Sequence, residues 1–293
     1  MKCQYLCGIY KLYLWVIVFL LPCMFFTVSK AEAQKNSERH WQFWLGGGGF
    51  MEPVYPGSDG LYIMPVPFIK AEYQLKSFDL FASVIDGIGV RYKKTEFAGL
   101  SFSVSINPLG NERDPGLKNI KRFMITDADD VKAFLKDTPS VDNNIEYFGT
   151  LKIDILPFTS LSSTIAYLPT KACYRIYPDR KYDGITASLD LKTGYQLSPK
   201  TIMQGGVGIA WMNDDYSEAF HGVLYSTSNL NVFAAKSGIS NVHGGFTLIN
   251  FFAEHYGVMI FGECKLLLGD ADDSPLTKTA FQPEMGLMIF YNF

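Results

Sequence analysis

The sequence predicts an all-β fold, namely a transmembrane antiparallel up-and-down β-barrel of about twelve strands with both termini on the periplasmic side. Three features favour it: extended segments that alternate between apolar and polar residues, short connections that alternate with long ones, and an aromatic residue at the carboxyl end. The 293 residues are 48% apolar, 15% aromatic and 19% charged, which excludes a disordered chain. No basic block is dense enough to neutralise a phosphate backbone, so no nucleic acid is expected as a partner.

The first residues have the pattern of a signal peptide. Two lysines precede or border an uninterrupted apolar run, Leu12 to Phe26, which is shorter than a transmembrane helix requires. Ala31-Glu32-Ala33 then has the small residues that signal peptidase accepts, which places the mature start at Gln34. We therefore expect residues 1–33 to be cleaved and residues 34–293 to form a single exported domain.

Three of the five cysteines lie in this leader, which leaves Cys173 and Cys264. Two thiols cannot build the disulfide framework of a small secreted domain. A single bridge between them is not favoured either, because Cys264 lies in the apolar phase of a predicted strand.

After the leader, apolar and polar residues alternate with period two. Between Ile145 and Ile155 the odd positions are apolar or glycine, and the even positions are Glu146, Phe148, Thr150, Lys152 and Asp154. The segment from Ile185 to Tyr195 repeats this pattern. The last segment places in one phase Phe281, Met285, Leu287, Ile289, Tyr291 and Phe293. A soluble sheet would bury its apolar face, whereas a membrane barrel turns it toward lipid.

The number and length of the segments favour the membrane barrel. Several predicted strands are longer than the five or six residues usual in soluble sheets. The predicted strands are 41–50, 61–73, 77–84, 88–93, 97–106, 144–155, 161–168, 183–195, 201–212, 240–252, 256–268 and 280–293. Short turns interleave with long connections, chiefly 107–143, 169–182 and 213–239, and the tight Asp86-Gly87 turn is the exception. An even strand number puts both termini on the short-turn side, which is periplasmic in bacterial barrels.

The polar phase predicts a lumen with charges of both signs. Its expected lining includes Arg91, Lys93, Glu146, Lys152, Asp154, Asp190, Lys192, Glu263, Lys265 and Glu284. These side chains either pair across strands and hold the barrel rigid, or line a path for solutes; strand number alone leaves both open. Lys70 and Asn250 are expected in the lipid-facing phase close to short turns, where a lysine costs roughly 0–1 kcal/mol.

No catalytic, cofactor-binding or metal-binding group is expected, so the sequence does not predict an enzyme. The run Gly46 to Gly49 lacks the Lys-Ser/Thr of a phosphate loop and suits relief of crowding in the first strand. The aspartates at 127–130 and 270–273 lack the glycine and glutamate of a calcium-binding EF-hand loop. Thr126 or Asp127 is expected to cap a short amphipathic helix that runs through Leu135. The four histidines lack metal-ligand spacing, and no Gly-x-Ser-x-Gly elbow is present.

Several motifs carry a family resemblance. They are Trp44-Leu45-Gly46-Gly47-Gly48, Tyr55-Pro56-Gly57-Ser58-Asp59, Pro65-Val66-Pro67, Asp215-Tyr216-Ser217-Glu218-Ala219-Phe220-His221-Gly222-Val223, Leu268-Gly269-Asp270-Ala271-Asp272-Asp273-Ser274-Pro275-Leu276 and the ending Tyr291-Asn292-Phe293. Together, in this order, they resemble the MipA/OmpV family of outer-membrane proteins, which is named for an MltA-interacting protein. Pro and Gly favour loop architecture over ligand binding in these motifs. Two departures are His221, where a second aromatic residue is expected, and the long segment 107–143.

The resemblance implies a non-enzymatic protein of the bacterial outer membrane, in contact with outer-membrane lipid and with Tyr291 and Phe293 as the barrel's carboxyl-terminal signal. Family members are associated with scaffolding an MltA-like lytic transglycosylase of murein to a bifunctional penicillin-binding protein. Porin-like and adhesive roles are the alternatives. A mixed-charge lumen would suit the channel, and the long loops 107–143 and 213–239 would suit the adhesin.

Overall fold

The computed structural model describes residues 40–293 except 76, 85, 95–99, 108–116, 118–122, 137, 142–144, 157, 174–177 and 227–229. The expected leader, residues 1–33, and its cleavage site lie outside the described residues. The chain divides into two units, Met1–His40 and Trp41–Phe293, and the second unit is the barrel.

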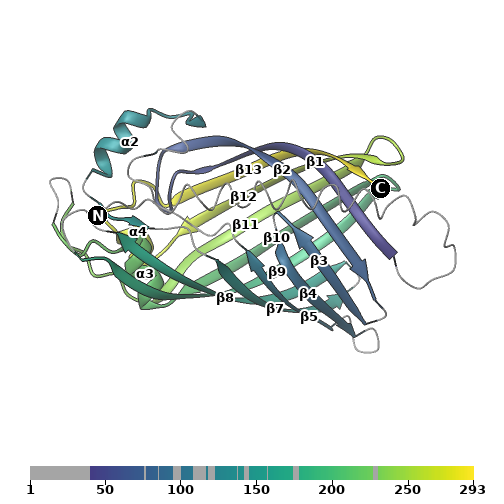
Figure 1. Ribbon diagram of the computed structural model, residues 1–293, viewed down its shortest axis with the longest axis horizontal. Helices are drawn as coiled ribbons and strands as arrows, with labels where there is room; N and C mark the ends of the chain where they lie inside the picture. The colour runs from purple at the N-terminus through teal and green to yellow at the C-terminus, as the bar shows by residue number, and fades with distance from the viewer. Residues whose placement is uncertain are drawn as a thin grey trace. The chain divides into compact units, whose positions relative to one another are not determined.

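Twelve strands close into an antiparallel barrel, as the sequence predicts (Figure 1). They are β1 (His40–Pro53), β2 (Leu61–Gln74), β3 (Phe78–Ser83), β4 (Gly87–Lys94), β5 (Leu100–Asn107), β7 (Glu146–Leu156), β8 (Thr159–Cys173), β9 (Arg180–Ser198), β10 (Thr201–Met212), β11 (Gly238–Phe251), β12 (Tyr256–Leu267) and β13 (Phe281–Asn292). Each barrel strand neighbours the next one along the chain, and the pairing of β13 with β1 closes the ring. The two-residue β6 (Ser140–Val141) only pairs with the carboxyl end of β8, at Ala172 and Cys173. The predicted up-and-down topology is therefore confirmed.

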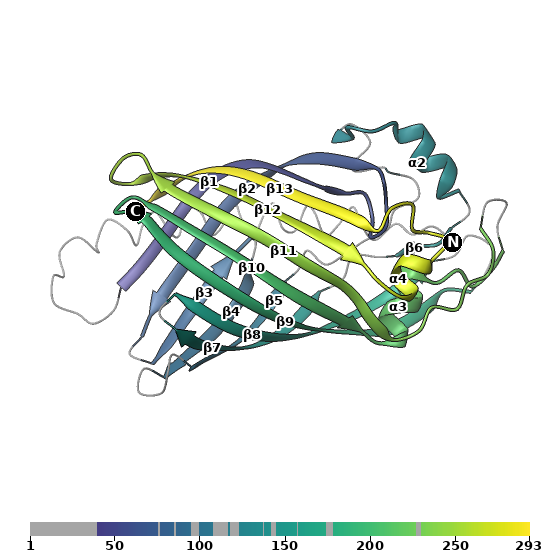
Figure 2. The same ribbon diagram turned by 180° about the vertical axis from the view of Figure 1, so that it is seen from behind.

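The two rims of the barrel differ in their connections. Three helices lie at one rim: α2 (Ala128–Phe134), α3 (Asp214–His221) and α4 (Asp270–Asp273). The chain's carboxyl end lies at the opposite rim, with short turns such as 199–200 and 252–255 (Figures 1 and 2). The predicted cap of α2 is confirmed, since Asp127 Oδ1 accepts a 2.8 Å hydrogen bond from the N–H of Asp129.

The alternation of β9 shows which face is outside. Leu189 and Leu191 are exposed on the outer face, whereas Asp190 between them is half-buried on the inner one. The ten steps from Ile185 to Tyr195 span about 33 Å along the strand. A tilt of 35–45° reduces this to about 23–27 Å along the membrane normal, which matches the apolar band of about 25 Å in outer-membrane barrels.

Aromatic side chains form a girdle at each end of this band. At the short-turn rim they contact one another in pairs and include Trp41, Phe43, Tyr73, Phe252, Tyr256, Tyr291 and Phe293. Phe293 also joins the last strand to the first one, because its N–H donates to the Phe43 carbonyl of β1 at 2.9 Å. Toward the other rim, Tyr147 and Tyr167 contact each other with ring centroids 6.1 Å apart. Two aromatic girdles that flank an apolar band are typical of a barrel in a bilayer.

The glycine run of β1 permits close strand contact. A Cβ on Gly46 would lie 2.0 Å from the Ile289 carbonyl oxygen of β13, and one on Gly48 would lie 1.8 Å from that of Leu287. Neither position can carry a side chain without moving the backbone. The interpretation of these glycines as relief of crowding fits this geometry.

Beside these glycines, the lumen near the short-turn rim is filled by an apolar cluster. Phe68, Met288 and Phe290 are buried there, with ring centroids of Phe68 and Phe290 5.5 Å apart. Partly buried residues packed around them are Trp44, Val66, Ile249, Phe251, Met259 and Phe261. This part of the barrel is an aromatic core rather than the polar lumen that the alternation predicts.

The apolar cluster corrects one expectation. Lys70 shares its phase with Val66 and Phe68 and was expected to face lipid, but it points into the barrel. Its Nζ lies 5.1 Å from the centre of the Trp44 ring and 3.1 Å from a carboxylate oxygen of Glu72. The expectation was wrong because the apolar neighbours of Lys70 belong to the inner cluster and not to the lipid-facing band.

Candidate functional site: the charged lumen and the outer cap

A first charged cluster lines the lumen on β2, β3 and β4. Antiparallel pairing sets Asp79 of β3 opposite Arg91 of β4. Arg91 Nη1 lies 3.7 Å from Asp79 and 3.9 Å from Glu72, and Lys93 forms a further ion pair with Asp79. Asp79 is only 3% exposed, so these cations offset the cost of burying its charge. Sequence analysis included Arg91 and Lys93 but missed both carboxylates.

A second cluster lies on β12 and β13. Glu263 and Glu284 face each other directly across the strand pair, an arrangement that like charges disfavour. Lys265 offsets the repulsion between the two carboxylates, because its Nζ contacts Glu284 and lies 3.6 Å from Glu263. All three residues were expected in the lumen, and one lysine shared by two glutamates keeps them together.

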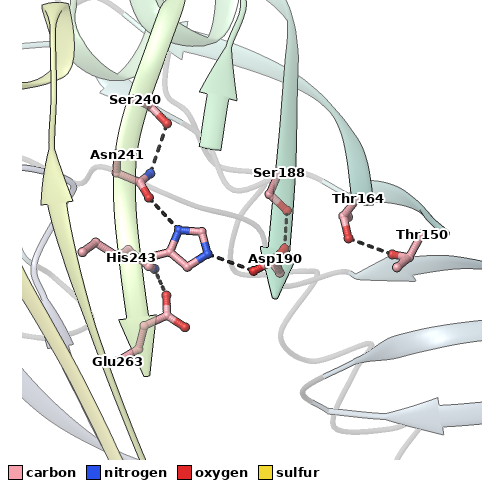
Figure 3. A network of polar contacts seen from close by, with 9 residues as sticks. Thr150, Thr164, Ser188, Asp190, Ser240, Asn241, His243 and Glu263 are labelled. Carbon is pink, nitrogen blue, oxygen red and sulfur yellow. Dashed lines mark hydrogen bonds and ion pairs between the residues drawn. The ribbon is translucent and has the colours of Figure 1, made fainter. Parts of the chain in front are cut away.

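A third polar contact spans three strands. Asp190 of β9, Gly208 of β10 and His243 of β11 occupy one rung of the sheet. His243 Nε2 lies 2.9 Å from Asp190 Oδ1 (Figure 3). A Cβ at Gly208 would lie only 2.4 Å from that nitrogen, so only glycine allows the contact. The sequence predicts no role for His243, because its spacing from the other histidines does not suit a metal site.

Hydroxyl groups and partly exposed charges line the wall of β4, β5, β7 and β8. Thr150 and Thr164 form a 3.0 Å hydrogen bond, which Figure 3 shows beside the histidine network. Lys152 Nζ lies 3.0 Å from Asp154, and both side chains are 46% exposed. By contrast the Asp190 and His243 side chains are 13% and 14% exposed. Water therefore reaches the wall near the end of β7 more easily than the wall near β10.

Not every expected lumen charge is paired. Glu146 and Lys192 occupy inward positions on β7 and β9 but form no ion pair with another residue in the described part of the chain. They remain predictions as functional residues.

The family motifs meet at the long-loop rim, where they form what we call the outer cap. The Tyr55 hydroxyl donates to the Leu276 carbonyl at 3.2 Å, and the Gly57 N–H donates to the Gln282 side chain at 2.9 Å. Gly57 has φ +95°, a conformation that suits glycine. Gln282 Nε2 in turn donates to the Ser58 carbonyl at 3.2 Å. The first motif is thereby bound to the segment after Asp273-Ser274-Pro275.

The second and third long motifs also contact each other. The Ser274 hydroxyl donates to the His221 carbonyl at 2.6 Å and accepts from the Leu276 N–H at 3.1 Å. His221 itself is buried, so an imidazole occupies the interior of the cap at the position where an aromatic ring was expected. A hydrophobic cluster then joins the loops, and its buried members are Tyr55, Leu117, Val131, Leu135, Val223, Leu230 and Leu276. Pro56, Asp59, Asp273 and Pro275 lie in the same cap, with Asp59 exposed.

The aspartates of the cap bind backbone groups. The Ser237 N–H donates to Asp214, a bond that holds the pKa of that carboxyl below its usual range. Asp270 accepts from the Lys236 N–H at 2.7 Å. Within the described ranges no group of three or more His, Cys, Asp or Glu side chains could hold a metal ion.

Cys173 and Cys264 are free thiols and do not form a bridge. No helix in the described part of the chain is long and apolar enough to cross a bilayer.

A closed barrel with an apolar outer band between two aromatic girdles defines the chain as a β-barrel of the bacterial outer membrane, in contact with lipid. Residues 45–293 match the family described as MltA-interacting protein MipA, and the chain belongs to that family. The resemblance seen in the motifs is thus confirmed. No curated protein matches the chain.

Solved structures of other barrels are similar to this one at low identity. The COG4313 outer-membrane channel from Pseudomonas putida F1 is 12% identical, with 86% of this chain and 95% of that chain covered and a TM-score of 0.46. A loop L8 deletion mutant of OmpT, an outer-membrane protein of Vibrio cholerae, is 9% identical, with coverage of 87% and 99% and a TM-score of 0.37. The NanC porin is 9% identical, with coverage of 85% and 98% and a TM-score of 0.38.

Proposed function

We propose that this barrel acts without catalysis of its own, as an outer-membrane anchor for an MltA-like lytic transglycosylase of murein. In this role it would hold the transglycosylase close to a bifunctional penicillin-binding protein. The observation that carries the proposal is membership of the MltA-interacting protein family over residues 45–293.

The pairing of charges in the lumen supports a structural role for the barrel rather than transport. The lumen's buried and partly buried carboxylates are compensated from neighbouring strands: Asp79 by Arg91 and Lys93, and Glu284 by Lys265. Charges that satisfy one another rigidify the wall and are less available to a passing solute. The apolar cluster around Phe290, on β1, β2 and β11 to β13, fills further space nearer the short-turn rim.

We infer that the short-turn rim faces the periplasm and forms the contact surface. Its described turns carry exposed apolar and exposed polar residues, among them Phe158, Lys200, Glu254 and His255. A stable interface generally buries about 800 Å² on each partner. A partner must therefore contact several turns at once rather than a single one.

The test is site-specific photocrosslinking in intact cell envelopes. A photoreactive residue in place of Lys200, at the short-turn rim, should capture a murein lytic transglycosylase. The matched control replaces Lys132 of α2, which is also exposed but lies at the opposite rim. Capture at neither position, or at Lys132 alone, would contradict the anchor and its orientation.

A channel for small solutes is the second candidate, because Lys93, Lys152 and Asp154 are each 46% exposed on the inner face. It predicts discrete conductance steps in planar bilayers. Lys192→Gln should change the step size or ion selectivity, since it removes a lumen charge without breaking an ion pair. A barrel that passes no ions at any voltage would rule the channel out.

A further inference from the structure

An open groove of about 590 Å³ lies on the outer face of β8 to β13, strands that Figure 2 shows side by side. Its outward-facing lining is apolar apart from one thiol and includes Leu191, Val207, Val242, Cys264, Leu266 and Phe281. His243 and Lys265 also border the groove, but their polar ends point into the lumen, toward Asp190 and Glu284. We propose that the groove binds one acyl chain of a lipid from the leaflet at the long-loop rim. The proposal does not depend on whether the barrel serves as an anchor or as a channel.

Two neighbouring rows of outward side chains form the sides of the groove. One row runs along a rung of the sheet from Leu191 of β9 to Cys264 of β12, and the next runs from Leu189 of β9 to Phe281 of β13. The rows are two residues apart along each strand, or about 7 Å. A hydrocarbon chain between them can therefore contact both rows at about 3.5–4.0 Å, the distance at which dispersion attraction is strongest.

A glycine opens the first row. Gly244 of β11 lies between Val207 and Cys264 on that rung and contributes no side chain. A Cβ at Gly244 would meet its nearest atoms at 3.5 Å, which is an ordinary contact, so the packing of the strands does not require glycine here. The missing side chain instead leaves space on the outer face, beside Val207, that a ligand can fill.

The groove runs obliquely from the middle of the apolar band to its edge at the long-loop rim. Leu189 lies in the middle of the apolar stretch of β9 between Ile185 and Tyr195, whereas Phe281, at the other end of the same row, is the first residue of β13. At a strand tilt of about 40°, each step along a rung rises by about 3 Å along the membrane normal. The four steps from β9 to β13 therefore rise by about 12 Å, which is half of an apolar band of about 25 Å. This is the depth of one leaflet.

Width, depth and polarity together favour an acyl chain as the ligand. A peptide segment would bring backbone N–H and C=O groups into hydrocarbon, where nothing in the described lining would satisfy them. The wall of a second barrel is wider than the gap of about 7 Å between the rows. The groove is also continuous with the lipid-facing band. A single chain that enters beside Phe281 and ends near Leu189 fits all three features.

Photolabelling by lipid tests the proposal directly. The full chain is folded in phosphatidylcholine vesicles that contain a small fraction of phosphatidylcholine with a diazirine midway along one acyl chain, and the adducts are mapped by peptide mass spectrometry. Per exposed residue, we expect about fivefold more adducts on the groove than on the wall of β4 and β5, where Ile88 and Ile106 also face lipid. Such an excess corresponds to a preference of about 1 kcal/mol. Equal labelling of the two walls would overturn the proposal.

A variant that fills the groove provides the second arm. Gly244→Leu closes the gap in the first row and should reduce its labelling to that of the β4 and β5 wall; if it does not fold, Cys264→Phe fills the same space. Gly149→Leu is the matched control, because Gly149 lies in the outward phase of β7 and a Cβ there would have no neighbour within 4 Å. It should leave the excess unchanged. An excess that persists in the filled variant, or that is also lost in the control, would contradict a chain bound in this groove.

The thiol of Cys264 reports whether a second copy of the chain occupies the groove instead. Cys264 is a free, exposed thiol on the outer face of β12. In a variant that lacks the other cysteines, mild oxidation in the same vesicles should leave the chain monomeric. A disulfide-linked dimer would show that two barrels meet at this face and would overturn the lipid site.

Discussion

Replacing Leu189 by arginine tests whether the outer face of the barrel contacts hydrocarbon. Leu189 is 47% exposed and lies four steps from Ile185 and six from Tyr195. At a tilt of about 40° it is therefore about 10 Å from one edge of the apolar band and about 15 Å from the other, close to the bilayer midplane. An arginine at that depth should cost about 2–4 kcal/mol.

The matched control is Leu197→Arg, beyond Tyr195 at the edge of the apolar band and on the same face of β9, where the cost should be about 0–1 kcal/mol. The expected difference of about 2–3 kcal/mol corresponds to a roughly 30- to 150-fold change in the unfolding equilibrium. Guanidinium unfolding and refolding in lipid vesicles measures both variants. Equal costs, or a near-neutral Leu189→Arg, would mean that water rather than lipid covers this face.

Three further predictions concern the interior, the first strand and the cap. Met288→Ala should cost about 2–5 kcal/mol in vesicle unfolding, because Met288 is 1% exposed in the inner cluster, whereas Met285→Ala, on the 49% exposed lipid side, should cost much less. Gly48→Ala should prevent folding to the heat-modifiable form seen on gels, while Gly49→Ala, whose Cβ would meet its nearest atom at 3.6 Å, should fold. Because the pKa of Asp214 is lowered, its carboxylate holds the loop before β11 at every pH above the usual carboxyl range. This hydrogen bond is lost as the pH falls through the lowered pKa. Amide exchange in that loop should accelerate in acid, and Asp214→Asn should abolish this dependence.

Much of the fold follows from period two. Alternation specifies both the strand and the face that each residue occupies. The predicted strand 201–212 has the same bounds as β10 in the structure. The turns are set by local chemistry, as in the Asp86-Gly87 turn, where Gly87 has φ +76°. These signals are local, so a single sequence contains them.

Alternation fails where the lumen itself is apolar. Phe68 and Phe290 lie inside, and no period distinguishes an apolar residue that contacts lipid from one that contacts another ring. The available signal is in β1, where Gly46 and Gly48 share the inward phase and leave room for large neighbours. Lys70 was misplaced for the same reason.

The site could be predicted only residue by residue. Charges in the polar phase were identified, but their partners depend on register, which the sequence does not contain. Asp190 and His243 are 53 residues apart and skip a strand, and only the alignment of both with Gly208 brings them together. The motifs of the cap likewise contact each other over long separations, as Tyr55 and Leu276 do across 221 residues.

Removal of a paired lumen charge has different expected effects in an anchor and in a channel. A channel uses its lumen charges to bind and release passing ions, so removing one should reduce or redirect conduction. In a structural body the same charges hold strands together, so removing one should loosen the wall. Asp79→Asn removes the carboxylate that Arg91 and Lys93 share and is the sharpest case, because Asp79 is 3% exposed. If the barrel is an anchor, this variant should be less stable by about 1–3 kcal/mol and should pass at least as much current as the wild type in planar bilayers. Lower current with unchanged stability would favour the channel instead.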